Sequence, residues 1–232
     1  MAKIGIMGGT FDPIHKGHLA LGQAAYSQYG LDRIWFMPSG HPPHKSAQKV
    51  TDGAIRLEMV RLAVETIPWF AVSDFELRRE GNTYTAQTLR LLKEAYPEHI
   101  FYFIIGADSL YQLESWFHPE EVMKQAVLLA AVRPYEQEHP DFETQIHYLQ
   151  KKYGARIGAL QFNEMDVSSE DIRNAAANGT LNGDCIPAPV ERYIRLHGLY
   201  QTNNELLRSS DKKEEDFSWK IHSARSAFSA EN

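Results

Sequence analysis

The chain has 232 residues, of which 43% are hydrophobic and 23% charged, and this balance is typical of globular proteins and excludes global disorder. Its length suits one domain, or one domain with a tail, rather than two large domains. A net charge of −6 argues against a nucleic-acid partner, because proteins that bind phosphate backbones usually carry a positive excess. We therefore expect any binding of phosphate to be local.

Cysteine content and hydropathy predict a cytoplasmic protein without a membrane partner. The single cysteine, Cys185, cannot form an internal disulfide, and chains without a cysteine framework are usually intracellular. The longest apolar runs, 100–105 and 126–132, are far shorter than the roughly 20 residues that cross a membrane. The first nine residues lack the apolar run and cleavage site of a secretory signal. Whether the chain forms a homo-oligomer stays open.

Predicted strands and helices alternate along the chain. Runs rich in β-branched and aromatic residues predict strands at 4–7, 34–37, 70–73, 100–105, 127–132 and 156–160. Apolar residues that recur every three or four positions predict helices at 19–29, 54–66, 85–95 and 142–153. Because the strands are apolar on both faces, we expect a doubly wound, Rossmann-like α/β fold with a mostly parallel sheet flanked by helices.

The composition changes near Gln201, which divides the chain into a predicted domain at 1–200 and a charged and polar extension at 201–232. The extension has no Gly or Pro and contains a mixed charged cluster at 211–216. Apolar and polar residues then alternate over 217–222, which is a weak strand pattern. Two interpretations remain open: a flexible or loosely docked tail, or an ordered segment packed on the domain or on a partner.

The strongest chemical signal is the segment 8–19, GGTFDPIHKGHL, which lies between the first predicted strand and the first predicted helix. At this position of an α/β sheet, the N–H groups of a helix start point at a bound anion. Gly8 and Gly9 allow close backbone approach, as does Gly17. His15 and His18, three residues apart, share one face of a helical turn. We expect a phosphate site here, although the lysine of a P-loop is absent.

A metal site is an alternative for these histidines. His41 and His44 could join His15 and His18 as nitrogen ligands of zinc. However, no cysteine or carboxylate completes a familiar ligand spacing, and Pro42 and Pro43 stiffen that loop. We therefore expect no metal held by protein side chains.

A second motif lies at 167–173, VSSEDIR. Serine followed by acidic residues two and three positions later is a helix-capping signature, and a plain capping box is one interpretation. Ser168, Ser169 and the helix start would also suit phosphate oxygens, with Arg173 one turn further on. The motif is therefore a candidate second anion site beside the first.

Taken together, these motifs resemble the nucleotidyltransferase superfamily that carries H-x-G-H and Ser-Ser-x-x-Ile-Arg signatures. Within it, the chain resembles the bacterial nicotinate-nucleotide adenylyltransferases, which join nicotinate mononucleotide to the AMP part of ATP. The matching blocks are 8–19, 42–45, 83–89, 103–116, 168–173 and a closing block at 189–200. The resemblance thus covers residues 1–200. One departure is Tyr135 after Arg133-Pro134, where the family usually has a glycine.

The resemblance implies adenylyl transfer, with His15, His18 and Arg173 as catalytic residues. His18 would stabilise charge on the α-phosphate of ATP, while the 168–173 motif would hold the β- and γ-phosphates. Mg²⁺ would arrive with ATP and stay coordinated mainly by phosphate and water. The ATP-binding residues implied are Gly8, Gly9, Thr10, Phe11, His15, His18, Gly106, Asp108, Ser168, Ser169 and Arg173. For Asp108, a helix N-cap is the alternative.

On the acceptor side, the resemblance implies that His44, Lys45, Thr85, Trp116 and Arg133 bind nicotinate mononucleotide. Lys45 would bind the phosphate, Trp116 would offer a flat face to the nicotinate ring, and backbone N–H groups near Thr85 would favour an acid over an amide. A solvated surface lysine is the alternative for Lys45, and a buried core tryptophan is the alternative for Trp116.

Other functions remain to be weighed. A small nucleotidyltransferase of the same fold, of the pantetheine-phosphate or cytidylyltransferase type, would share the nucleotide site but lack the blocks around Thr85 and Trp116. A fragment of a class I aminoacyl-tRNA synthetase would need a Lys-Met-Ser-Lys-Ser loop, which the sequence lacks. A nucleotide-sensing module without turnover is disfavoured, because the sequence keeps His15, His18, Lys45 and Arg173.

Overall fold

The computed structural model describes residues 1–40, 50–132, 141–162 and 165–201. Within them the chain forms one six-stranded sheet with the order β3-β2-β1-β4-β5-β6, and every neighbouring pair is parallel. The strands are β1 (Lys3–Gly9), β2 (Arg33–Pro38), β3 (Phe70–Val72), β4 (Ile100–Ile105), β5 (Val127–Ala131) and β6 (Ile157–Leu160). The predicted strands and the doubly wound fold are confirmed.

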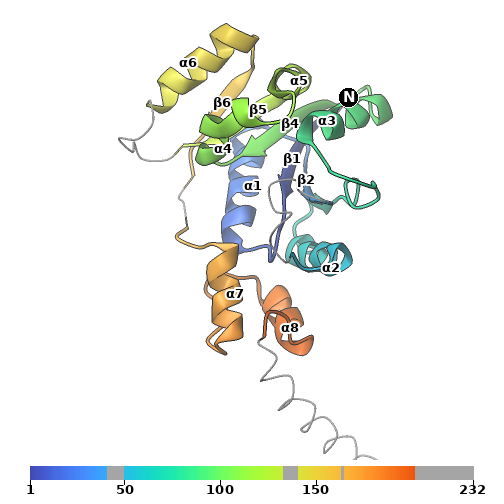
Figure 1. Cartoon of the computed structure of the whole chain (residues 1–232), viewed down its shortest axis with the longest axis vertical. Coiled ribbons are helices and arrows are strands. Elements are labelled where there is room, and N and C mark those ends of the chain that lie inside the picture. The colour runs from blue at the N-terminus through green and yellow to red at the C-terminus, as the bar shows by residue number, and fades with distance from the viewer. Residues whose placement is uncertain (41–49, 133–140, 163–164, 202–232) are drawn as a thin grey trace, which may run out of the picture.

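Helices cover both faces of the sheet (Figure 1). One face packs against α1 (Lys16–Tyr29), α2 (Gly53–Val64), α7 (Ser169–Ala177) and α8 (Ala188–Leu196). The other packs against α3 (Thr85–Ala95), α4 (Ala107–Gln112), the 3₁₀ turn η2 (Leu113–Ser115), α5 (Pro119–Gln125) and α6 (Phe142–Tyr153). The four predicted helices correspond to α1, α2, α3 and α6, and the capping signature at 168 marks the start of α7.

Alternation along the strands explains why both faces are apolar. In β1, Ile4 and Ile6 belong to the hydrophobic cluster under α3 and α5, whereas Met7 belongs to the cluster under α1 and α2. Successive side chains of a strand point to opposite faces of the sheet. A central strand with helices packed on both faces therefore has no side chain exposed to solvent.

The strand order creates a crevice between β1 and β4. Strands β2 and β3 lie on one side of β1, and the later strands β4, β5 and β6 lie on its other side. Ligands of open α/β sheets bind outside the carboxyl ends of the strands where the order reverses in this way. Here those ends carry Gly8-Gly9 and Gly106.

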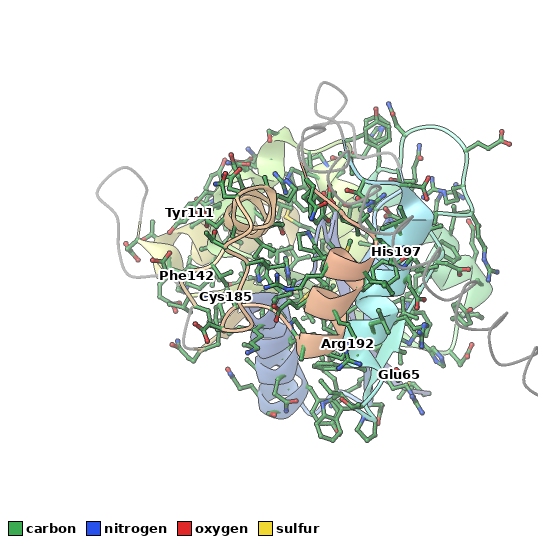
Figure 2. All side chains as sticks on the ribbon, turned by 90° about the horizontal axis from the view of Figure 1, so that it is seen from below. Glu65, Tyr111, Phe142, Cys185, Arg192 and His197 are labelled. Atoms are coloured by element: carbon green, nitrogen blue, oxygen red, sulfur yellow. The ribbon has the colours of Figure 1, made fainter. Side chains whose placement is uncertain are left out.

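Helices α7 and α8 lie together below the sheet in Figure 1, with α7 below α1 and α8 below α2. Figure 2 shows α8, with Arg192 and His197, beside the end of α2 at Glu65. The segment before α8 contacts the start of α1, because the Lys16 backbone N–H donates to the Cys185 carbonyl at 2.9 Å. The last third of the chain thus returns to the loop that follows β1.

Among the described residues, none of the helices has the length and apolar character needed to cross a membrane. Of the predicted extension at 201–232, residues 202–232 lie outside the described part of the chain, so both interpretations of that segment remain predictions.

Candidate active site

Two cavities open at the carboxyl edge of the sheet, and Gly8, Phe103, Ser109 and Trp116 line both of them. The histidine cavity, of about 320 Å³, is lined further by residues of the β1–α1 loop, of α1, of the end of β4 and of the segment before α7. The threonine cavity, of about 310 Å³, is lined further by the ends of β1 and β2 and by the segment 76–88. Both are large enough for parts of a small-molecule ligand, and they share one wall.

His15 and His18 lie together in the histidine cavity, as their spacing predicts. Their ring centroids are 3.7 Å apart, and His15 is the N-cap residue of α1. The His15 backbone N–H donates to His18 Nδ1 at 3.2 Å, so a neutral His18 carries its proton on Nε2. His15 Nδ1 is buried and has no hydrogen-bond partner in the described structure.

Burial keeps both imidazoles neutral near pH 7. It lowers the pKa of His15 to about 4, because a buried site disfavours the charged form. Burial, and then the charge of His15, lower the pKa of His18 well below its ordinary value. Each ring therefore offers a neutral N–H donor before an anion arrives.

The loop between β1 and α1, residues 10–15, is called the histidine loop below, and it is held by hydrogen bonds to α2 and to the segment just before α2. Arg56 of α2 is buried, and its guanidinium donates to the carbonyls of Thr10 at 2.7 Å, Thr51 at 2.8 Å and Ser39 at 2.9 Å. Asp12 accepts from the Thr51 backbone N–H at 3.0 Å. The bonds to the Thr10 carbonyl and to the Asp12 carboxylate therefore hold the histidine loop without a ligand.

Helix α7 begins against the same loop. The Ser169 hydroxyl donates to the Pro13 carbonyl at 2.9 Å, and Arg173 donates to the Asp12 carbonyl at 2.8 Å. The second candidate anion motif therefore does lie beside the first. Ser168 forms the capping box with Asp171 that the sequence allows, and this bond is compatible with either interpretation of its role.

The capping alternative for Asp108 is wrong. Gly106 is the N-cap residue of α4 and has an extended conformation directly after β4. Asp108 lies in the first turn of the helix and is exposed. Gly106 lines the histidine cavity.

On the acceptor side, Thr85 and Trp116 both line the threonine cavity. Thr85 is the first residue of α3. Trp116 is half-buried and meets Phe103 edge-on, with ring centroids 6.2 Å apart. It packs partly against the core while it lines both cavities, so the core alternative describes only part of its environment. Phe117, the next residue, stacks on Tyr84 at 4.3 Å.

Three predicted acceptor residues, His44, Lys45 and Arg133, lie outside the described residues, as does His41 of the zinc alternative. In the part of the chain that the structure describes, no three His, Cys, Asp or Glu residues gather in a way that could hold a metal ion.

Sequence reasoning missed several residues around the cavities. Phe162 and Met165 line the histidine cavity from the irregular segment before α7, where the sequence has no periodic pattern. Glu76 lines the threonine cavity, and the only feature of the sequence that could have pointed to it is its closeness to the 83–89 block. No feature of the sequence points to Arg56, because its hydrogen-bond partners lie in three separate segments.

Comparison with known proteins identifies the family. Residues 6–175 match the cytidylyltransferase-like family. A protein of Lachnoclostridium phytofermentans named "Probable nicotinate-nucleotide adenylyltransferase" is 44% identical over 200 residues, which cover 86% of this chain and all of that protein. The nicotinate-nucleotide adenylyltransferase of Bacillus subtilis is 37% identical, and the match covers 87% of this chain and all of that protein. The chain belongs to the nicotinate-nucleotide adenylyltransferase family.

Members of this adenylyltransferase family are nucleotidyltransferases of NAD biosynthesis, so the chain is an enzyme of that class. Two solved structures of the Plasmodium falciparum nicotinic acid mononucleotide adenylyltransferase support the fold at 21% identity, each over 86% of this chain and 98% of that one. One, complexed with NaAD, has a TM-score of 0.69, and the other, complexed with APC, has a TM-score of 0.67.

Proposed function

We propose that this adenylyltransferase binds ATP in the histidine cavity and nicotinate mononucleotide in the threonine cavity, and forms nicotinate adenine dinucleotide and pyrophosphate. The observation that carries this assignment is the shared wall of Gly8, Phe103, Ser109 and Trp116. Ligands in the two cavities would meet at this wall, at the carboxyl end of β1.

The reaction needs no nucleophile from the protein. An oxygen of the acceptor phosphate forms a bond to the α-phosphorus of ATP, and the bond from that phosphorus to the bridging oxygen breaks as pyrophosphate leaves. Positioning and stabilisation of charge supply most of the acceleration in such transfers. The side chains around the histidine cavity can provide both.

We assign the donor roles as follows. His18, with its proton on Nε2, donates to the α-phosphate, and His15 donates beside it. Arg173, together with Ser168 and Ser169 at the start of α7, holds the β- and γ-phosphates. These assignments rest on the positions of the rings and on the contact of α7 with the histidine loop.

The remaining ATP contacts come from backbone at the strand ends. Gly8, Gly9, Thr10 and Phe11 follow β1, and Gly106 and Asp108 follow β4 on the adenosine side. Mg²⁺ fits this arrangement, because it would bind together with ATP and neutralise part of the negative charge of the ATP phosphates. The imidazole, hydroxyl and guanidinium groups at the site are hydrogen-bond donors to phosphate, and they do not form a set of carboxylate ligands for the ion.

On the acceptor side, Trp116 offers a flat face to the nicotinate ring, and the N–H groups near Thr85 at the start of α3 face its acid group. His44, Lys45 and Arg133 would bind the acceptor phosphate and the rest of the mononucleotide, an assignment that comes from the sequence motifs alone.

A pyrophosphate-release assay with a panel of substrates tests the proposal. We expect turnover with ATP and nicotinate mononucleotide, and weaker turnover with the nicotinamide form. Preference for pantetheine phosphate, or for CTP over ATP, would contradict it in favour of another nucleotidyltransferase. Binding of ATP without release of pyrophosphate from any acceptor would instead favour a nucleotide-sensing protein.

A further inference from the structure

The end of α1 is hydrogen-bonded to the outer edge of β6. In the described part of the chain, β6 is the last strand of the sheet, with β5 as its one neighbour, and an edge strand leaves a row of backbone groups without a partner strand. The Tyr29 hydroxyl donates to the Ala159 carbonyl at 2.9 Å. The Gln28 side-chain amide donates to the Gln161 carbonyl and accepts from the Gln161 backbone N–H at 3.0 Å. Two adjacent side chains of α1 therefore occupy part of the edge that a further strand would use.

The two contacts hold different parts of the chain. Tyr29 holds β6 itself, because its ring also lies against Gly158, where a Cβ atom would collide with it. Gln28 holds Gln161, the first residue after β6. Since the amide both donates to and accepts from the same residue, it fixes the direction of that stretch of backbone as well as its position. Gln28 thus controls how the chain leaves the sheet.

Phe162, the next residue, lines the histidine cavity. The same cavity is lined by Ile105 and Gly106 at the end of β4 and by Ala131 at the end of β5. Because β4, β5 and β6 are neighbours in the sheet, these residues form a largely apolar wall across three strand ends. In the proposed function the ATP phosphates lie at the two histidines, so this wall is left for the nucleoside. An aromatic ring there offers a flat surface to a base.

We propose that Gln28 is a positioning residue for ATP, which holds Gln161 so that Phe162 keeps its place on the wall of the histidine cavity. This inference rests on the proposed function, which supplies the nucleotide. Gln28 is exposed and does not line the cavity, so it acts through Phe162 and not by contact with the ligand. Because the pairing of β5 with β6 ends at Leu160, the amide takes over the role of the strand ladder at the next residue.

Gln28→Leu tests the inference, because leucine keeps much of the apolar stem and removes both hydrogen bonds. We expect the KM for ATP to rise roughly five- to tenfold, which corresponds to the loss of one or two hydrogen bonds. The KM for nicotinate mononucleotide should stay within about twofold. The melting temperature should stay within about 2 °C, since Gln28 and Gln161 are exposed and water can bond the freed groups. Gln28→Glu, which keeps the size but places a carboxylate against the Gln161 carbonyl, should raise the KM for ATP as well.

Tyr29→Phe is the matched control at the neighbouring position. It removes the bond to Ala159, which lies within β6, and leaves the contact between Gln28 and Gln161 in place. The melting temperature should fall by roughly 2–4 °C, while both KM values stay within about twofold. One variant should therefore change nucleotide binding without stability, and the other should change stability without nucleotide binding.

A double-mutant cycle shows whether Gln28 acts through Phe162. Phe162→Ala removes the ring and should itself raise the KM for ATP. Addition of Gln28→Leu to that variant should change the KM by less than about twofold, because a ring that is absent cannot be displaced. Calorimetric binding of ATP to the four proteins of the cycle gives the same comparison without turnover.

These measurements separate the inference from the function on which it rests. A parent protein that binds ATP but does not adenylylate nicotinate mononucleotide contradicts the proposed function alone, and the calorimetric cycle still tests Gln28. A parent protein that does not bind ATP refutes both. An unchanged KM for ATP in Gln28→Leu would overturn the inference, as would equal rises for the two substrates. Full additivity of the two substitutions would also contradict it, because Gln28 would then affect binding independently of Phe162.

Discussion

Replacement of Arg56 by methionine is expected to destabilise the protein strongly, although Arg56 touches neither cavity. The side chain is 2% exposed, and all three of its guanidinium nitrogens donate to backbone carbonyls. Methionine preserves much of the apolar stem and removes these donors. The carbonyls of Thr10, Ser39 and Thr51 are then left without the partner that they have in the parent.

Hydrogen bonds from a charged donor contribute about 1.5–3 kcal/mol each, and their contributions are not additive. Removal of one partner of a buried ion pair costs about 3–5 kcal/mol, because the other charge is left uncompensated. Here the buried Asp12 loses the nearby positive charge of Arg56. We therefore expect the free energy of unfolding to fall by about 3–5 kcal/mol. For a chain of this size, that corresponds to a melting temperature lower by roughly 6–20 °C.

Arg61→Met is the matched control, since it lies on the same helix. Arg61 is 45% exposed and pairs with Glu58 at 2.7 Å and with Glu65 at 3.1 Å. Exposed pairs of this kind contribute about 0–1 kcal/mol. Thermal and urea unfolding followed by circular dichroism would compare the two variants. Equal melting temperatures for Arg56→Met and Arg61→Met would refute the view that Arg56 holds the histidine loop.

Four further perturbations address the site and the end of the domain. His18→Ala should reduce the rate of adenylyl transfer by roughly 10- to 150-fold, equivalent to about 1.5–3 kcal/mol of lost hydrogen bonding, and a rate within threefold of the parent would contradict its role. Trp116→Ala should raise the acceptor KM with little change in ATP binding, whereas an equal loss of both would mark a core residue. Because the pKa of His15 is lowered to about 4, the unfolded chain binds a proton between pH 6.5 and 4 that the folded chain does not. Stability should therefore fall by roughly 3 kcal/mol as the pH drops through this range, and His15→Asn should flatten the decline in parallel unfolding experiments. Deletion of 202–232 should leave kcat nearly unchanged, whereas deletion of 200–232 should lower the melting temperature, because Tyr200 donates to Asp12 at 2.7 Å; equal melting of the two truncated proteins would rule this out.

The parts of the fold that repeat a local pattern could be predicted from the sequence. Each predicted strand overlaps an observed one, because a buried parallel strand needs a short run that is apolar on both faces. The helices that were missed are short: α4 has six residues and α5 has seven, which is too few to show a helical period. Helix α8, with nine residues, lies in a segment that the sequence marked only as a family block.

The chemistry of the site was predictable for a different reason. Phosphate binding at a strand-to-helix turn needs glycines and donors close together in the chain, so 8–19 carries its signal within twelve residues.

The positioning of that chemistry could not be predicted, since it depends on contacts between residues far apart in the sequence. Asp12 lies in the middle of the most conspicuous motif, yet its partners are Thr51, Arg173 and Tyr200. Tyr200 is the last residue of the closing block, and burial and the bond to Asp12 raise the pKa of its hydroxyl, so this hydroxyl remains a donor to the Asp12 carboxylate across the physiological pH range. The histidine loop is thus bounded by α2, by α7 and by the end of the domain. A motif of twelve residues supplies the donors, and nearly two hundred residues of chain are needed to hold them in place.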